Sequence, residues 1–172
     1  MWLFESLEGR LLIALAIGLL IGAERERRKG TGVDRKPAGL RTFALVALVG
    51  GASAALGHEL AIAAGFLAIG GLATASYLLG DRSDPGLTSE VALVLTYALG
   101  ALAQLAPRAA LACGVLAASL LALRAPLHRF TRLLTEDELR DALVFGISAA
   151  VVLPLLPDRT VDPWGVLNPF TL

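Results

Sequence analysis

The feature that most constrains this sequence is a run of basic residues between two apolar segments, within residues 18–46. The first apolar segment ends at Glu24 and Arg25, and the second begins near Leu40. The connection carries the cationic residues Arg27, Arg28, Lys29, Arg35 and Lys36. So much charge is unstable in hydrocarbon, and loops rich in Lys and Arg stay on the cytoplasmic side of a membrane. The pattern therefore predicts a helical hairpin whose connection lies on the cytoplasmic face of a membrane.

The composition extends this interpretation to the whole chain. Hydrophobic residues make up 56% of the 172 residues, and the mean hydropathy is +0.70, well above that of a soluble globular chain. The apolar residues occur in blocks separated by charged clusters, which indicates several membrane spans rather than one buried core. The expected fold class is therefore all-α, a polytopic integral membrane bundle of about six transmembrane helices.

The apolar blocks place a five-span domain in residues 1–123. Its spans are expected at about 2–22, 40–56, 60–79, 88–106 and 109–123. The polar half of the first span is expected either to lie at the outer interface or to pack its charges against neighbouring helices. The pair Gly70-Gly71 is the only candidate for a helix break within a span.

Residues 124–172 are predicted to form an amphipathic connector, a sixth span and an interfacial tail. The connector, residues 124–134, mixes Arg and His with apolar residues and is expected to lie along the membrane surface. The sixth span is expected to begin at a capping box, in which Thr135 and Glu138 bond each other's backbone amides. The tail carries Trp164 and Phe170 among turn residues, a composition typical of the membrane interface.

The distribution of charge predicts the orientation. Twelve of the 15 Lys and Arg residues fall on one side of the six-span arrangement, and Arg10, Arg108 and Arg159 fall on the other. Basic loops face the cytoplasm, so both termini are expected outside a bacterial-type inner (plasma) membrane. Glu5 and Glu8 stand where a signal peptide would carry positive charge, so the first span is expected to remain in the mature protein.

Small residues recur every four positions in several of these spans, which lets helix backbones approach closely. The helix-packing residues of this kind are Ala14, Gly18, Gly22, Gly51 and Gly114. Together they offer more close-packing surface than a simple antiparallel bundle needs. We therefore expect the ridge of Ala14, Gly18 and Gly22 to face another chain, in a homo-oligomer such as a dimer or on another membrane protein.

Polar residues at the cytoplasmic ends of the spans form the candidate functional cluster. Its members are Glu24, Arg25, Arg41, Thr42, Thr88, Glu90 and Asp141. Charged groups near membrane depth are usually paired or functional, and Glu24 and Arg41 flank the same loop at the same depth. A structural role stays open for each: Arg25 and Arg41 as snorkelling side chains, and Glu90 as the partner of a helix dipole.

Other residue types point to no catalytic, cofactor-binding or metal site, and we expect that the protein is not an enzyme. His58 and His128 fall in turns on opposite sides of the membrane, and residues 29–32 lack the spacing of a phosphate-binding loop. The single cysteine, Cys113, is expected to be a small packing residue. No folded module accompanies the basic loop, so nucleic acid is not an expected partner, whereas the lipid bilayer is.

Within residues 18–46 the sequence resembles the membrane domain of the MgtC/SapB family. The matching features are a GxLIGxER end to the first span, a basic loop, and AGLRTFALV at the start of the second. Residues 88–102 are similar to the family's fourth-span pattern, and the resemblance covers most of residues 7–123. It implies a five-span domain with an outside amino terminus, linked to growth and virulence under low magnesium and to membrane energetics.

After the fifth span the sequence resembles a longer subgroup of the family instead, in which a second membrane domain of unknown function follows. Residues 127–128, 133–139 and 153–157 carry this similarity. It implies that the chain is a fragment of a longer protein or one partner of a split pair.

Two functions follow as expectations. The first is a role in magnesium, ion or membrane homeostasis, exerted through contact with itself or with another membrane protein. The alternative is an ion or small-solute transporter or channel, with Glu24, Arg41 and Glu90 lining a polar site on the cytoplasmic side. A hydrated cavity at which these residues converge would favour the alternative.

Overall fold

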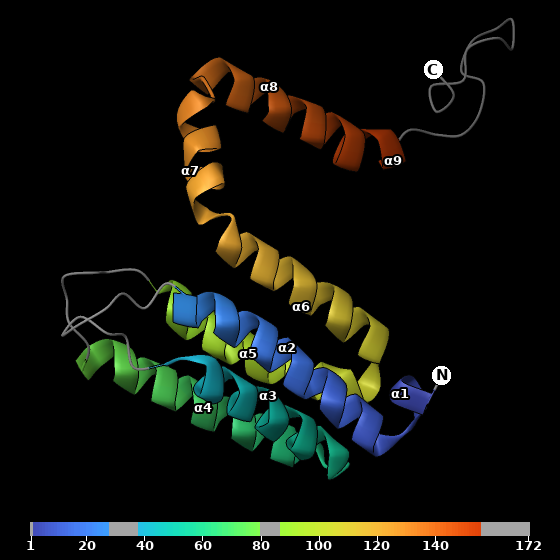
Figure 1. Cartoon of the computed structure of the whole chain (residues 1–172). Helices are drawn as coiled ribbons and strands as arrows, with labels where there is room; N and C mark the ends of the chain where they lie inside the picture. The colour runs from blue at the N-terminus through green and yellow to red at the C-terminus, as the bar shows by residue number, and fades with distance from the viewer. Residues whose placement is uncertain (1, 28–37, 80–86, 156–172) are drawn as a thin grey trace, which may run out of the picture. The chain divides into compact units, whose positions relative to one another are not determined.

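The computed structural model describes residues 2–27, 38–79 and 87–155, and over these residues the chain is helical with no strand (Figure 1). It divides after Arg124 into two units. The first unit contains α1 (Trp2–Glu5), α2 (Leu7–Arg27), α3 (Leu40–Ala55), α4 (Glu59–Leu79), α5 (Thr88–Leu105) and α6 (Pro107–Ala122). The second unit begins within α7 (Arg124–Leu133) and contains α8 (Glu136–Ile147), a π-helical turn (Ser148–Val152) and α9 (Leu153–Leu155). The all-helical fold class is thus confirmed for the described residues.

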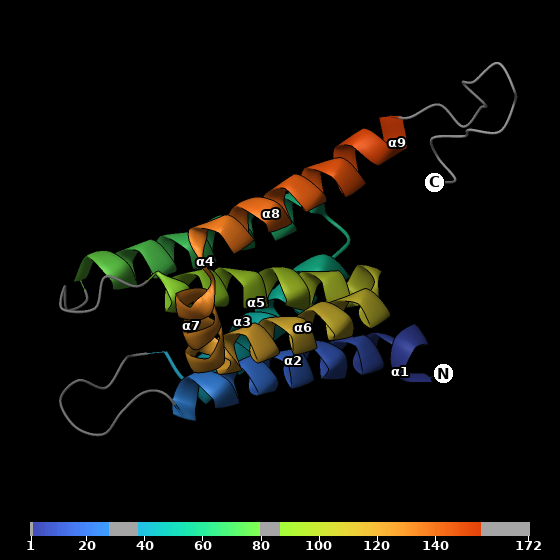
Figure 2. The ribbon, with the colours of Figure 1, turned by 90° about the horizontal axis from the view of Figure 1, so that it is seen from above.

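The centre of the first unit is formed by α2, α3 and α5, which pack against one another. Helix α6 lies on α2 and α5, and helix α4 lies on α3 and α5 (Figures 1 and 2). The largest side chains that are fully buried are Tyr97, Phe43, Ile17 and Ile21. Residues on the inner stripes of the helices thus make the core, as expected for amphipathic packing.

Glycines allow these central helices to approach closely. A methyl group added at Gly18 of α2 would lie 2.6 Å from the Phe43 carbonyl oxygen of α3 and 2.8 Å from Cα of Ala44. Likewise, Gly100 of α5 lies directly against the Ala47 carbonyl group of α3. Only a residue without Cβ fits at such contacts, as in other closely packed helix pairs.

The expectation that the Ala14, Gly18 and Gly22 ridge contacts another chain is wrong. Ala14 is 0% exposed, Gly22 lies against Leu40, and helix α3 covers the ridge within the same chain. Gly51 and Gly114 also lie at contacts inside the first unit, Gly51 beside Leu11 and Gly114 beside Ile17. The periodicity locates a contact surface, but it carries no information about whether the partner helix belongs to the same chain.

The first expected span differs from the structure at both ends. The helix is interrupted at Ser6, whose side-chain oxygen accepts a hydrogen bond from the Gly9 amide at 3.0 Å and caps the start of α2. At the other end, α2 continues through the charged residues to Arg27 instead of finishing before them. Glu and Arg are good helix formers, so charge ends the apolar stretch without ending the helix.

Two described helices, α4 and α5, are long and apolar enough to cross a membrane. Helices α3 and α6 are 16 residues long, about 24 Å, somewhat short of a bilayer's hydrocarbon core. Helix α2 is 21 residues long but carries charges at both ends. The candidate break at Gly70 and Gly71 is not a break, because α4 is continuous from Glu59 to Leu79.

The capping box at the start of α8 is confirmed. The Thr135 hydroxyl accepts from the Glu138 amide at 3.2 Å, and the Thr135 amide donates to the Glu138 carboxylate at 2.9 Å. Residues 124–133 form α7, with Leu127, Phe130 and Leu133 exposed. The predicted interfacial tail, with Trp164 and Phe170, lies outside the described residues.

Candidate functional site

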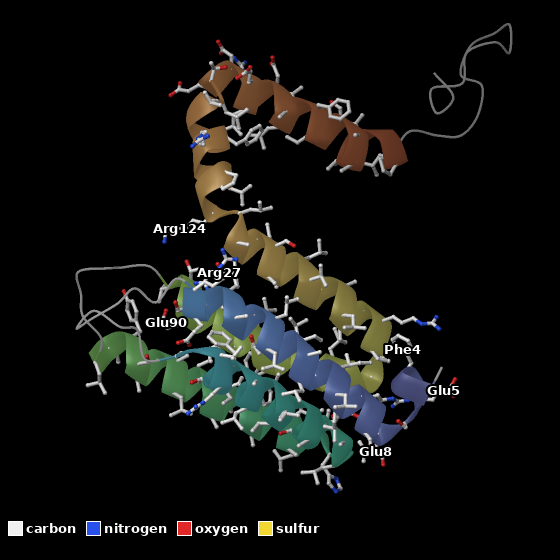
Figure 3. The ribbon with its side chains drawn as sticks, in the orientation of Figure 1. Phe4, Glu5, Glu8, Arg27, Glu90 and Arg124 are labelled. Atoms are coloured by element: carbon white, nitrogen blue, oxygen red, sulfur yellow. The ribbon has the colours of Figure 1, made fainter. Side chains whose placement is uncertain are left out.

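The charged side chains of the first unit lie at its two ends, separated by apolar helix. Figure 3 shows Arg27, Glu90 and Arg124 at one end and Phe4, Glu5 and Glu8 at the other. The first of these, the Glu90 end, is where α2 and α4 finish and α3 and α5 begin. It contains most of the predicted polar cluster, so the helix order brings these residues to one end of the bundle.

At the Glu90 end, Glu24 forms an ion pair with Arg25, the next residue in the chain, so the predicted Glu24–Arg41 pair is wrong. Arg25 Nε lies 2.7 Å from Glu24 Oε2, and the two side chains are 12% and 11% exposed. Arg41 is exposed in the first turn of α3 and makes no ion pair with a described residue. Because α2 continues past residue 25, both Glu24 and Arg25 belong to its last turns.

The other members of the predicted cluster do not converge on one point. Thr42 is half-buried in α3 and Thr88 is exposed at the start of α5. Asp141 belongs to the second unit and is exposed there. Among the described residues, no three His, Cys, Asp or Glu side chains lie together as a metal site requires.

A groove between α4 and α5 is the clearest binding-site candidate in the described chain. Its cavity volume is about 580 Å³. Its lining includes Phe66, Gly70 and Ala73 of α4 and Glu90, Val94 and Ala98 of α5. Glu90 provides the only carboxylate among the described lining residues, so the groove is an apolar channel with one acidic group towards one end.

One carboxylate oxygen of Glu90 has no hydrogen-bond partner among the described residues. The Oε2 atom is buried, and no described residue donates a hydrogen bond to it. Buried polar atoms are nearly always hydrogen-bonded, since an unpaired one loses its hydration without compensation. Within the predicted cluster, Glu90 is the described residue that combines such an oxygen with a place in the groove lining.

Tyr97 attaches α4 to the bundle, and the sequence analysis did not single it out. Its hydroxyl donates to the Ile62 carbonyl oxygen at 2.9 Å, and its ring meets the Phe66 ring at a centroid distance of 6.3 Å. The ring also lies against Gly65, where no Cβ blocks it. A lone tyrosine within an apolar block was the available signal, because a buried hydroxyl needs an acceptor on another element.

The opposite end of the unit carries a second polar contact that the sequence analysis left open. Arg10 Nη1 donates to the Gln104 carbonyl oxygen at 2.8 Å, and its Nε donates to the Phe4 carbonyl oxygen at 3.1 Å. Arg108 lies over the Phe4 ring, 5.5 Å from its centroid. Arg10 thus packs against neighbouring helices, the second of the two alternatives, and fixes α1 and α2 to the end of α5.

Cys113 occupies an exposed position on α6, in contrast to the packing role expected for it. The adjacent Gly114 turns inward onto Ile17. Successive helix positions differ by about 100° in direction, so the two neighbours point to different environments.

Comparison with known proteins supplies one match. The sequence model of the MgtC family matches residues 11–130, which include α3, α4, α5, α6 and most of α2. The match contains the groove, Glu90 and Tyr97. No curated protein and no solved structure matches the chain.

Proposed function

The chain belongs to the MgtC family, a family of membrane proteins, and we propose that it is a multi-pass protein of a bacterial inner membrane. In this proposal α2 to α6 and α8 are the spans, and the Glu90 end faces the cytoplasm. The charge bias of the sequence supports the orientation. The outward face of α4 supports the placement in lipid, since Leu60, Leu67 and Leu79 are 80%, 73% and 87% exposed.

Labelling of single cysteines tests the orientation. In a Cys113→Ala background, Arg27→Cys should be protected from a membrane-impermeant thiol reagent added to intact spheroplasts, because it lies at the cytoplasmic end of α2. His58→Cys, at the other end of α3, should be labelled under the same conditions. Labelling of Arg27→Cys but not of His58→Cys would reverse the orientation.

We further propose that the protein supports magnesium or ion homeostasis by contact with itself or another membrane protein, without catalysis and without conducting an ion through its centre. The observation that carries this choice is the apolar centre of the α2, α3 and α5 bundle. Among the described residues the buried polar side chains are Thr96 and Gln104. Thr96 donates to the Ala92 carbonyl oxygen of its own helix at 2.7 Å, and Gln104 lies in the last turn of α5. A permeation path needs polar or hydrated walls, which this centre does not offer.

A growth assay combined with a flux assay tests this function. We expect the chain to restore growth at low magnesium to a bacterial strain lacking its own family member. Purified protein in liposomes should give no Mg²⁺ uptake above that of protein-free liposomes, because the centre of its bundle is largely apolar. An empty vector serves as the growth control, and Mg²⁺ uptake that disappears in Glu90→Gln would contradict the proposal.

Transport is the second candidate function, and the α4–α5 groove is the observation that favours it. Glu90 lies in this groove, as expected for a site on the cytoplasmic side. The flux assay therefore decides between the two candidates.

A further inference from the structure

The α4–α5 groove and the buried oxygen of Glu90 together point to a ligand. Helix α4 is much less buried than α5, with 11% against 50% of its apolar stretch covered, and leaves much of its length exposed beside α5. The groove opens to the outside, because its lining residues Tyr77, Val91 and Leu95 are 41%, 61% and 40% exposed. In the membrane placement proposed above, on which this inference rests, that opening faces lipid.

The walls of the groove fit hydrocarbon, and its acidic end fits a cation. Phe66, Ala73 and Val94 provide apolar surface along the channel. The Glu90 Oε2 atom is buried without a described donor, so an N–H group that carries positive charge is its natural complement. The expected ligand therefore combines an apolar chain with a cationic donor at one end.

The structure also narrows the kind of cation. A hard metal ion takes six or more oxygen ligands, whereas Glu90, Thr74 and Tyr77 are the only described lining residues with side-chain oxygens and the rest of the lining is apolar. A second copy of α4 would not supply a cation either, because residues 59–79 contain no Lys, Arg or His. A primary ammonium group needs few protein ligands and carries three N–H donors, which suits a single carboxylate.

We propose that the α4–α5 groove binds a phospholipid with a primary ammonium headgroup, namely phosphatidylethanolamine. One acyl chain lies along the apolar walls, and the ammonium group donates to the Glu90 carboxylate where that residue lines the groove. The bound lipid would fill the space between α4 and α5 and give the Glu90 carboxylate a cationic donor. This site adds a specific lipid ligand to the proposed role in membrane or ion homeostasis.

Native mass spectrometry of the purified full chain in detergent tests the proposal. The probes are phosphatidylethanolamine and phosphatidylcholine with identical acyl chains, because the choline headgroup keeps its charge but has no N–H donor. We expect about tenfold stronger retention of phosphatidylethanolamine, the factor typical of one charge-assisted hydrogen bond. Glu90→Gln should remove this preference, whereas Glu59→Gln, an exposed carboxylate at the opposite end of α4, should keep it.

A matched pair of glycine variants tests the location of the site. A Cβ added at Gly70 or at Gly71 meets no atom within 4 Å, but only Gly70 belongs to the groove lining. Gly70→Leu should therefore fill the groove and lower retention of both lipids, while Gly71→Leu should bind them like the wild type. If Glu90→Gln does not fold, the two glycine variants and the comparison of the two lipids on the wild type still test the proposal.

Equal retention of the two lipids by the wild type would overturn the proposal. Loss of a dimer in Gly70→Leu with unchanged lipid retention would overturn it too, and would assign the groove to a second copy of the chain. The lipid-retention assay does not depend on magnesium. A negative result in it would therefore contradict the lipid site alone, whereas a growth or flux result opposite to the expected one would contradict the proposed function.

Discussion

Gly100→Ala should unfold or strongly destabilise the first unit, although it adds a single methyl group. The new Cβ would collide with the Ala47 carbonyl group of α3, and backbone cannot move aside as a flexible side chain can. Overpacking of a close contact costs about 3 kcal/mol or more where backbone must shift. For a chain of this size we expect the thermal midpoint in detergent to fall by about 6 °C or more. Size-exclusion chromatography of samples heated to increasing temperatures measures this midpoint as the temperature at which half of the monodisperse protein is lost.

Gly71→Ala is the matched control for this prediction. Gly71 is also a helix-interior glycine, but a Cβ there meets no atom within 4 Å. Alanine favours the helix over glycine by up to about 1 kcal/mol, so this variant should be neutral or slightly more stable. If Gly100→Ala were as stable as Gly71→Ala, the close contact between α3 and α5 would be incorrect.

Tyr97→Ala should release α4 from the bundle while the other helices of the first unit stay folded. Tyr97 is fully buried, bonds the Ile62 carbonyl oxygen and meets the Phe66 ring, both on α4. Removing a large buried aromatic side chain costs about 3 to 5 kcal/mol, and here the lost contacts fall largely on one helix. Hydrogen–deuterium exchange should therefore rise strongly in residues 59–79 and little in residues 7–27.

Two further substitutions separate the ring of Tyr97 from its hydroxyl. Tyr97→Phe keeps the ring and loses one hydrogen bond, so it should cost only about 0.5 to 1.5 kcal/mol. Tyr77→Ala removes a tyrosine that is 41% exposed on α4 and should change exchange little. A uniform rise in exchange across α2, α3 and α5 in Tyr97→Ala would show that Tyr97 holds the whole unit rather than α4.

The sequence by itself determined the helical class, most helix positions and the capping box. Apolar blocks of the right length and charged clusters between them constrain local structure directly, because each acts within a few turns of chain. Thr135 and Glu138 are three residues apart, so their mutual bonds follow from helix geometry alone. The family resemblance at residues 18–46 also agrees with the match over residues 11–130.

The tertiary structure alone decided which surfaces and side chains meet. Spacing showed that Gly18 lies on a smooth ridge, but only the packed bundle shows that α3 of the same chain covers it. Proximity in the sequence suggested Glu24 with Arg41, yet the direction of each side chain around its helix gave Arg25 as a partner instead. The unpaired oxygen of Glu90 depends on which side chains α4 and α5 bring around it, and no single segment encodes that arrangement. Contacts between helices depend on rotation and separation together, whereas sequence periodicity reports only the rotation of each helix.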